Sequence, residues 1–277
     1  MAEDIMAPIL TKLAQSLPAS VPFVGPENLE RSRGAVFKAR LGANENGFGP
    51  SEKANAAMAQ AAGDVWMYAD PENHDLKHAL AQHNSVAPEN IVVGEGIDGL
   101  LGYLCRLIVE PGVNVVTSDG AYPTFNFHVA GFGGTLTKVP YQNDAEDPDA
   151  LLDAAAQTAA RLIYFSNPDN PMGTEHGPTV VGNMIDRVPD GSLLILDEAY
   201  SEYTQLGLAP IDVSDERVIR FRTFSKAHGM AGARVGYGIG HPDLIKAFDK
   251  IRNHFGMSKV SVAGALAALA DQTHLDA

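Results

Sequence analysis

The chain has 277 residues, of which 45% are hydrophobic and 19% are charged, a composition typical of a globular protein with one large core or two smaller ones. Acidic residues outnumber basic residues by 34 to 20, and the net charge of −14 disfavours binding to nucleic acid or to an anionic membrane surface. The single cysteine, Cys105, excludes an internal disulfide.

Residues 1–50 are rich in proline and glycine, and they predict an arm or lid rather than part of a core. The N-terminus begins acidic and lacks the long apolar segment of a secretion signal. No apolar run in the sequence approaches the roughly 18 residues of a membrane span. We therefore expect a soluble, cytoplasmic protein.

From about residue 52 onward, predicted helices and strands alternate. The expected strands are short, continuously apolar and β-branched, which is typical of strands covered on both faces; they are residues 90–94, 112–119, 161–167, 192–200 and 217–224. Residues 97–109 and 147–160 have the apolar spacing of helices between them. This alternation predicts an α/β fold, a three-layer α/β/α sandwich with a mostly parallel sheet.

Four of the predicted strands lead directly into chemically reactive or polar side chains. These residues are Asp98, Asn170, Asp197 and Lys226. Ligands of open α/β sheets bind beyond the carboxyl ends of the strands. We therefore expect the four side chains to converge on one cleft.

The first of these turns contains a glycine motif. Gly94, Gly96 and Gly99 have G-x-G-x-x-G spacing between a strand and a helix, and Asp119 ends the next strand, so the segment formally matches the dinucleotide fingerprint. What all such turns share is a helix start with free N–H groups, which binds a phosphate. A phosphate site is the favoured interpretation; a dinucleotide site and a plain tight turn remain alternatives.

Lys226 and Asp197 indicate which phosphate the chain binds. The amine of Lys226 can form a Schiff base with an aldehyde, and pyridoxal phosphate (PLP) is the cofactor whose chemistry starts from that bond. Asp197, at the end of an apolar strand, is suited to keep the pyridine nitrogen protonated. The plainer interpretation of Asp197 is a helix cap or a surface turn.

With these residues in place, the chain resembles the fold-type I, PLP-dependent aminotransferases of class I/II, and within them the histidinol-phosphate aminotransferase branch. The resemblance covers nearly the whole chain in order, in the segments LPASVPFVGPENLERSRG, LGANENGFGPS, MYADPENHDLKHAL, VGEGIDGLL, AYPTF, SNPDNPMGT, LILDEAY and TFSKAHGMAGARVGY. It implies an N-terminal arm and start of a small domain in residues 1–50, a large PLP-binding domain in 51–245, and the beginning of a small C-terminal domain in 246–277.

The resemblance implies roles around the cofactor ring. Lys226 matches the lysine that bonds to the cofactor, and Asp197 matches the partner of the pyridinium nitrogen. Tyr200 and Asn170 match the donors to the ring's phenolic oxygen, where they favour its ionised form. Phe125 matches the aromatic side chain that stacks on the ring, with a plain core phenylalanine as the alternative.

The same resemblance implies a phosphate site and a dimer. The implied phosphate ligands come from a helix start and from the segment around the lysine, namely Ile97, Asp98, Gly99, Thr223, Ser225 and Arg234. Arginine binds a phosphate bidentately. Tyr68 matches a tyrosine that reaches the neighbouring subunit's phosphate, which implies a homodimer; a half-buried ring is the alternative. His228 is interpreted as a supporting residue rather than a proton carrier.

The implied activity is transamination between an amino donor, histidinol phosphate or an aromatic amino acid, and 2-oxoglutarate or a similar keto acid. A decarboxylase of the threonine-phosphate type or a C–S lyase is the alternative, because these enzymes share the cofactor contacts. A nucleotide-binding oxidoreductase or a non-catalytic binding protein also stays open.

The sequence departs from the family pattern at Gly42, Gly99 and Met172, and none of these three changes removes cofactor chemistry. No arginine follows Arg252 that could grip a substrate carboxylate, so we expect a C-terminally truncated chain.

Overall fold

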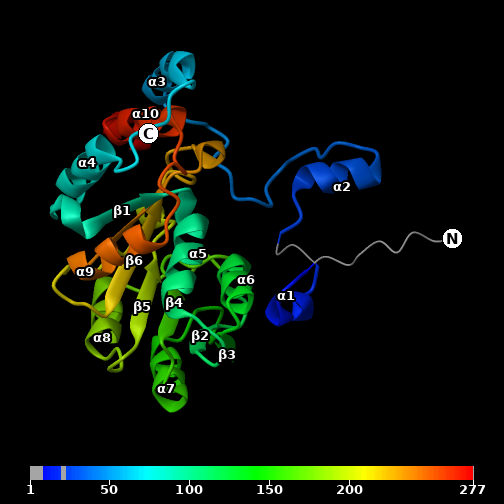
Figure 1. The fold of residues 1–277 in the computed structure, drawn as a ribbon, viewed down its shortest axis with the longest axis vertical. Coiled ribbons are helices and arrows are strands. Elements are labelled where there is room, and N and C mark those ends of the chain that lie inside the picture. Colours follow the sequence, from blue (N-terminus) through cyan, green and yellow to red (C-terminus); the bar gives the residue numbers. More distant parts are fainter. Residues whose placement is uncertain (1–8, 20–22, 277) are drawn as a thin grey trace.

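A single sheet of seven strands forms the centre of the molecule (Figure 1). The computed structural model of the chain describes residues 9–19 and 23–276, so the expected absence of a secretion signal falls largely outside the described residues. In chain order the strands are β1 (Ile91–Gly94), β2 (Asn114–Ser118), β3 (Thr135–Val139), β4 (Leu162–Ser166), β5 (Leu193–Asp197), β6 (Val218–Thr223) and β7 (Gly236–Gly240). The helices are α1 (Lys12–Ser16), α2 (Pro26–Arg33), α3 (Glu52–Ala61), α4 (His74–Asn84), α5 (Gly96–Ile108), α6 (Pro123–Gly131), α7 (Pro148–Thr158), α8 (Pro178–Asp186), α9 (Pro242–Ala247), α10 (Lys259–Leu269) and α11 (Gln272–Leu275).

The sheet is parallel except at one strand. Its order is β1-β7-β6-β5-β4-β2-β3. Strand β7 runs antiparallel to both β1 and β6, and the other paired strands are parallel. The predicted α/β class with a mostly parallel sheet is confirmed.

Helices cover both faces of the sheet because side chains alternate along each strand. Tyr164 of β4 and Ile195 of β5 pack on one face with α5, α6 and α9. Their neighbours Ile163 and Phe165 pack on the other face with α7 and α8. Toward β1 that second face is covered by α4 and α10, against which Ile91 packs. The result is the three-layer sandwich expected from the sequence.

All five expected strands and both expected helices are present, but two further strands were not predicted. Strand β7 has the sequence GYGIG, in which three glycines replace the β-branched residues that identify a strand. Strand β3 lies at the edge of the sheet and is largely half-exposed, so polar residues interrupt its apolar pattern. Both strands are set by their neighbours rather than by local sequence.

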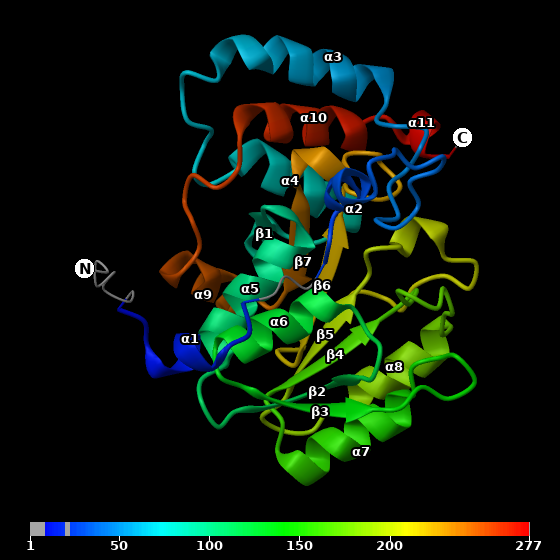
Figure 2. The ribbon, with the colours of Figure 1, turned by 90° about the vertical axis from the view of Figure 1, so that its right-hand side faces the viewer.

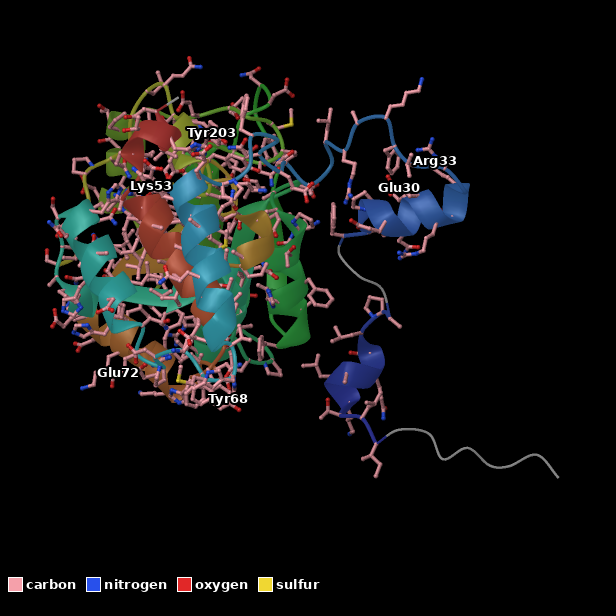
Figure 3. The ribbon with its side chains drawn as sticks, turned by 90° about the horizontal axis from the view of Figure 1, so that it is seen from above. Glu30, Arg33, Lys53, Tyr68, Glu72 and Tyr203 are labelled. Carbon is pink, nitrogen blue, oxygen red and sulfur yellow. The ribbon has the colours of Figure 1, made fainter. Side chains whose placement is uncertain are left out.

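Helices from the two ends of the chain meet beyond β1. Figures 1 and 2 show α3 beside α10, and a side-chain carbon on Gly264 of α10 would come within 2.6 Å of Met58 of α3. Helix α2 projects from this body in Figures 1 and 3. The domain boundaries expected at residues 50 and 245 stay a prediction. No helix in the described ranges is both long and apolar enough to cross a bilayer.

Candidate active site

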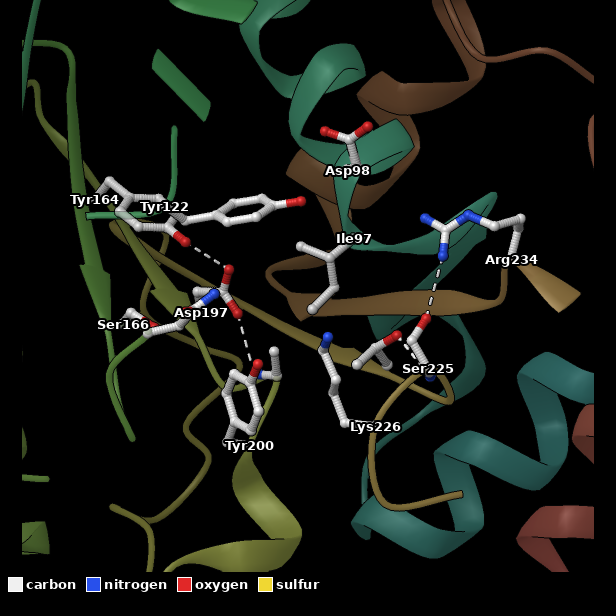
Figure 4. A pocket seen from close by; sticks show the side chains of 13 residues that line it. Ile97, Asp98, Tyr122, Tyr164, Ser166, Asp197, Tyr200, Ser225, Lys226 and Arg234 are labelled. Carbon is white, nitrogen blue, oxygen red and sulfur yellow. Dashed lines mark hydrogen bonds between the residues drawn. The ribbon is translucent and has the colours of Figure 1, made fainter. Parts of the chain in front are cut away.

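The polar residues that follow the strands line one cavity at the carboxyl edge of the sheet (Figure 4). Asp98 follows β1, Asn170 follows β4, Asp197 ends β5 and Lys226 follows β6. Parallel strands end at the same edge, so the fold itself brings these side chains together. A wider cavity of about 470 Å³ continues outward past Lys226 and includes Phe23 of the arm.

The Lys226 amine points into the cavity (Figure 4). Its Nζ donates hydrogen bonds to the backbone oxygens of Ala43 at 3.0 Å and Asn44 at 3.4 Å. Burial lowers the pKa of Lys226, and the positive charge of Arg234 lowers it further, while Asp197 opposes the change. A lowered pKa increases the fraction of neutral amine, which is the nucleophilic form.

Asp197 is almost fully buried, at 4% exposure. Its Oδ2 accepts a hydrogen bond from the Tyr164 hydroxyl at 2.6 Å, and its Oδ1 accepts one from the backbone N–H of Ala199 at 3.0 Å. Burial raises the pKa of Asp197 to about 6, although these two hydrogen bonds favour the ionised form. The carboxylate is therefore held in one orientation at the inner wall of the cavity, which is not what a helix cap or surface turn requires.

The other end of the cavity is suited to bind an anion (Figure 4). Arg234 Nη1 donates to Ser225 Oγ at 3.2 Å, and the Ser225 N–H donates to Thr223 Oγ1 at 3.0 Å. Arg234 is permanently charged. The α5 helix starts beside it, with free N–H groups and the positive end of the helix dipole.

The helix residues predicted to bind phosphate lie in the first turn of α5. Ile97 and Asp98 line the cavity, and Gly99 lies one position further along the helix. The Asp98 side chain is held by His128 of α6, whose Nε2 lies 2.9 Å from Asp98 Oδ1. The backbone at the start of α5, rather than this carboxylate, is therefore the part suited to a phosphate.

Two glycines allow Arg234 and the start of α5 to approach each other. Gly96 has φ +80°, and a side-chain carbon there would lie 2.3 Å from Arg234 Nη2. A side-chain carbon on Gly236, the first residue of β7, would lie 2.6 Å from the backbone nitrogen of Ile97. Because β7 is antiparallel, its first residue lies at the carboxyl edge of the other strands, and Arg234 is delivered to the cavity from there.

Tyr200 and Asn170 lie on the side of the cavity toward the arm. Both line it together with Lys226. The Tyr200 hydroxyl accepts a hydrogen bond from Asn44 Nδ2 at 2.9 Å, so the arm orients this tyrosine. Burial raises the pKa of Tyr200, which keeps the hydroxyl protonated and able to donate.

Phe125, which the resemblance places on the cofactor ring, is not among the residues that line this cavity. Phe125 is 0% exposed and stacks on Tyr164, with ring centroids 4.6 Å apart. Helix α6 turns it inward because it lies in the first turn, on the face that packs against the sheet. Tyr122, the residue before the helix, lines the cavity instead. The segment AYPTF therefore offers a different aromatic side chain from the one predicted.

Tyr68 and His228 lie outside the lining of this cavity. Tyr68 is 77% exposed at the edge of the body (Figure 3), where its ring lies 4.6 Å from that of Phe255. His228 is buried against Phe224, and burial lowers its pKa to about 4. A neutral, enclosed imidazole is consistent with the prediction that His228 supports the site rather than carries a proton.

Several lining residues were not predicted. Tyr122, Tyr164, Ser166 and Ala199 all face the cavity. Tyr164 had a detectable signal, because a tyrosine in an otherwise apolar strand needs a partner for its hydroxyl when buried. Asn44 had no detectable signal in the sequence, because its contact with Tyr200 joins residues far apart in the chain.

Comparison with known proteins identifies a family for most of the chain. The family model described as aminotransferase class I and II matches residues 38–277. Among solved structures, the chain is similar to histidinol-phosphate aminotransferase from Sinorhizobium meliloti in complex with pyridoxal-5'-phosphate. The TM-score is 0.93 at 56% identity, over 96% of this chain and 72% of that one.

Two curated relatives differ in their named activity. The histidinol-phosphate aminotransferase of Moorella thermoacetica is 35% identical over 94% of this chain and 68% of its own length. The aromatic amino acid aminotransferase of Mycobacterium avium is 39% identical over 83% of this chain and 66% of its own length. The chain thus spans about two thirds of the length of these relatives.

Proposed function

Because the chain belongs to the aminotransferase class I and II family, we propose that it binds PLP and transfers an amino group from a donor to 2-oxoglutarate or a similar keto acid. One observation carries this proposal. The half-buried amine of Lys226 and the buried carboxylate of Asp197 face the same cavity, whose far end is lined by Arg234 and the start of α5.

The residues present fit this cofactor. PLP carries an aldehyde, a basic ring nitrogen and a phosphate, and the cavity offers an amine, a carboxylate and a cationic end. Gly96 and Gly236 allow Arg234, β7 and the start of α5 to lie close together at the cationic end. A side-chain carbon on Gly96 would collide with Arg234, and one on Gly236 would collide with the backbone of α5. Bound PLP supplies an aldehyde that condenses with amines and a ring that withdraws electrons from the substrate's α-carbon.

Lys226 has two proposed tasks. Its neutral amine would hold the cofactor at its aldehyde, and Nζ, when free, would take the proton from the donor's α-carbon. Both tasks require the unprotonated amine, which the lowered pKa of Lys226 favours. Asp197 would hold a proton on the ring nitrogen through its own negative charge.

The remaining lining residues orient the cofactor. Tyr200 and Asn170 would donate to the phenolic oxygen, and Tyr122, which lines the cavity, would offer an aromatic face to the ring. Thr223, Ser225, Arg234 and the N–H groups of Ile97, Asp98 and Gly99 hold the phosphate. These roles rest on the lining of the cavity and on hydrogen bonds such as that from Arg234 to Ser225.

For the donor we propose histidinol phosphate first and an aromatic amino acid second. Relatives with both names resemble the chain at similar identity, and the outer cavity includes the aromatic side chains Phe23 and Tyr122. We also propose that the protein is a homodimer in which Tyr68 reaches the partner's phosphate. The high exposure of Tyr68 supports this.

Trapping the lysine tests the proposed function. The chain is incubated with PLP, reduced with borohydride and digested, and the masses of the peptides are measured by mass spectrometry. We expect a pyridoxyl mass on the peptide with Lys226, no such mass in Lys226→Ala, and a retained mass in the distant control Lys53→Ala. An unlabelled Lys226 peptide in the wild-type chain would contradict PLP binding.

Product analysis separates transamination from its alternative. Histidinol phosphate, aromatic amino acids and phosphothreonine are offered with 2-oxoglutarate. Glutamate formation without carbon dioxide supports an aminotransferase. Carbon dioxide release without glutamate would instead indicate a decarboxylase of the threonine-phosphate type.

A further inference from the structure

Two buried carboxyl groups lie beneath the loop that carries Asn170. Glu146, just before α7, is 2% exposed, and Asp169, in the loop after β4, is 5% exposed. Neither lines the cavity that contains Lys226. Acidic side chains are almost never fully buried unless they are paired, so these two require a physical explanation.

Their hydrogen bonds fix both carboxyl groups. Glu146 Oε2 accepts from Ser118 Oγ at 2.5 Å, and Oε1 accepts from the Ser166 N–H at 2.9 Å. Asp169 accepts from the Tyr141 hydroxyl at 3.1 and 3.2 Å. In the described part of the chain, all of these donors are neutral.

Two neighbouring carboxylates without a cation cannot both be ionised at low cost. Burial raises the pKa of Glu146 and the negative charge of Asp169 adds to this effect, so that the pKa lies at about 8 although the hydrogen bonds from Ser118 and Ser166 lower it. Burial also raises the pKa of Asp169. The other titratable groups facing the pair are Tyr141, whose pKa is raised by burial, and His176, whose Nε2 lies 2.8 Å from the Glu146 backbone oxygen. At neutral pH one proton is therefore retained between the two carboxyl groups.

The pair is connected directly to the loop beside the cavity. Asp169 Oδ2 accepts from the Met172 N–H at 3.1 Å, and the Asp169 N–H donates to the Thr174 oxygen at 2.8 Å. The loop is fixed at its other side by His176, whose N–H donates to Asn167 Oδ1 at 2.7 Å. Asn170 is the next residue after Asp169 and lines the cavity with Lys226.

We propose that Glu146 and Asp169, sharing one proton, form a positioning pair that fixes the loop of residues 167–173 and thereby holds Asn170 against the cofactor's phenolic oxygen. The role of Asn170 in this inference rests on the proposed function. The pair itself touches neither cofactor nor substrate.

The pair gives stability a definite pH dependence. The folded protein holds the shared proton more tightly than the unfolded chain, in which glutamate has its ordinary pKa of 4.5. Stability from this proton is therefore complete below pH 4.5 and is lost progressively as the pH rises from 4.5 to about 8. Above that pH two adjacent negative charges repel each other beneath the loop.

The first experiment uses the cofactor-free chain. Melting temperatures are measured from pH 6 to 9 for the wild type, for Glu146→Gln, and for the exposed control Asp149→Asn. We expect the wild type and the control to lose melting temperature through about pH 8, and Glu146→Gln, which cannot ionise, to lose much less. If the melting temperatures of all three proteins changed with pH in parallel, the inference of a shared proton would be overturned.

The second experiment tests whether Asn170 is held in position in the PLP-loaded chain. The pH midpoint of the bound cofactor's absorption is measured for the wild type, Asn170→Ala, Glu146→Ala and Glu146→Gln. Loss of a donor to the ionised phenolic oxygen is expected to raise the midpoint in Asn170→Ala by roughly one pH unit. Glu146→Ala should raise it in the same direction, and Glu146→Gln should restore the wild-type value.

These outcomes separate the inference from the proposed function. A wild-type midpoint in Glu146→Ala or in Asn170→Ala, while borohydride still labels Lys226, overturns the positioning role alone. An unlabelled Lys226 contradicts the proposed function, and the melting curves of the cofactor-free chain still decide whether the proton is shared.

Discussion

Asp197 shows how one residue can be costly for the free protein and necessary for the proposed cofactor. Its carboxyl is buried, and its pKa of about 6 lies above the ordinary value of 3.8. The cofactor-free protein therefore loses stability as the pH rises from 3.8 to about 6, by about 3 kcal/mol in total. A pyridinium nitrogen beside the carboxylate would remove this penalty, so the site is stabilised by the ligand it is proposed to bind.

Asp197→Asn should separate these two effects. At pH 8 the cofactor-free variant is expected to melt at a higher temperature than the wild type, because no charge is left buried. Its affinity for PLP should fall at least tenfold, or by about 1.4 kcal/mol, because the charge on the ring nitrogen loses its partner. Calorimetry and a PLP titration measure the two quantities. Unchanged affinity would argue against the proposed role of Asp197.

At the scale of secondary structure elements, β7 determines whether the end of the cavity that is proposed to bind the phosphate exists. The strand places Arg234 at the carboxyl edge of the sheet only because it runs antiparallel between β1 and β6. Gly236 then permits the start of α5 to contact the strand backbone. The glycines that make β7 hard to predict from the sequence are therefore the residues that allow it to pack closely against its neighbours.

Gly236→Ala is expected to push β7 and α5 apart. The new carbon would lie 2.6 Å from the Ile97 nitrogen and 2.7 Å from the Gly96 carbonyl carbon, and backbone atoms cannot rotate away. We expect a loss of about 1–3 kcal/mol in the free energy of unfolding and weaker PLP binding. Denaturant unfolding measures the change in the free energy of unfolding.

Gly232→Ala is the matched control, since nothing lies within 4 Å of the carbon it would add. Equal stability of the two variants would show that the close approach of α5 and β7 is not required.

At the scale of the whole molecule, an exposed apolar surface surrounds Tyr68. Val65, Trp66 and Tyr68 are 63%, 79% and 77% exposed, and Phe255, which packs on Tyr68, is 51% exposed. Contiguous apolar patches of this kind mark interaction sites. The cluster agrees with the proposal that a second subunit covers this surface.

We expect the 29.4 kDa chain to sediment as a dimer. Tyr68→Phe keeps the ring that packs on Phe255 but removes the hydroxyl proposed to reach the partner's phosphate. This variant should remain dimeric and bind PLP several-fold more weakly, because one hydrogen bond to a charged group is lost. A monomer at micromolar concentration, or unchanged PLP affinity in the variant, would contradict the proposed interface.

The sequence alone was sufficient for the fold class, five of the seven strands and the residues at their carboxyl ends. Buried parallel strands are continuous apolar segments, so their ends can be located and the first residues of the cleft named, including Lys226 and Asp197. The family resemblance rests on the same segments, and the match over residues 38–277 agrees with it.

Only the tertiary structure decided which side chains complete the lining of the cavity. The inward turn of α6 excluded Phe125 and left Tyr122 at the cavity, the antiparallel β7 delivered Arg234, and Glu146 met Asp169 beneath the loop. Each outcome depends on contacts between segments far apart in the chain. Local sequence carries the preference of a segment for helix or strand, whereas the direction of a side chain and the proton it holds depend on what packs against it.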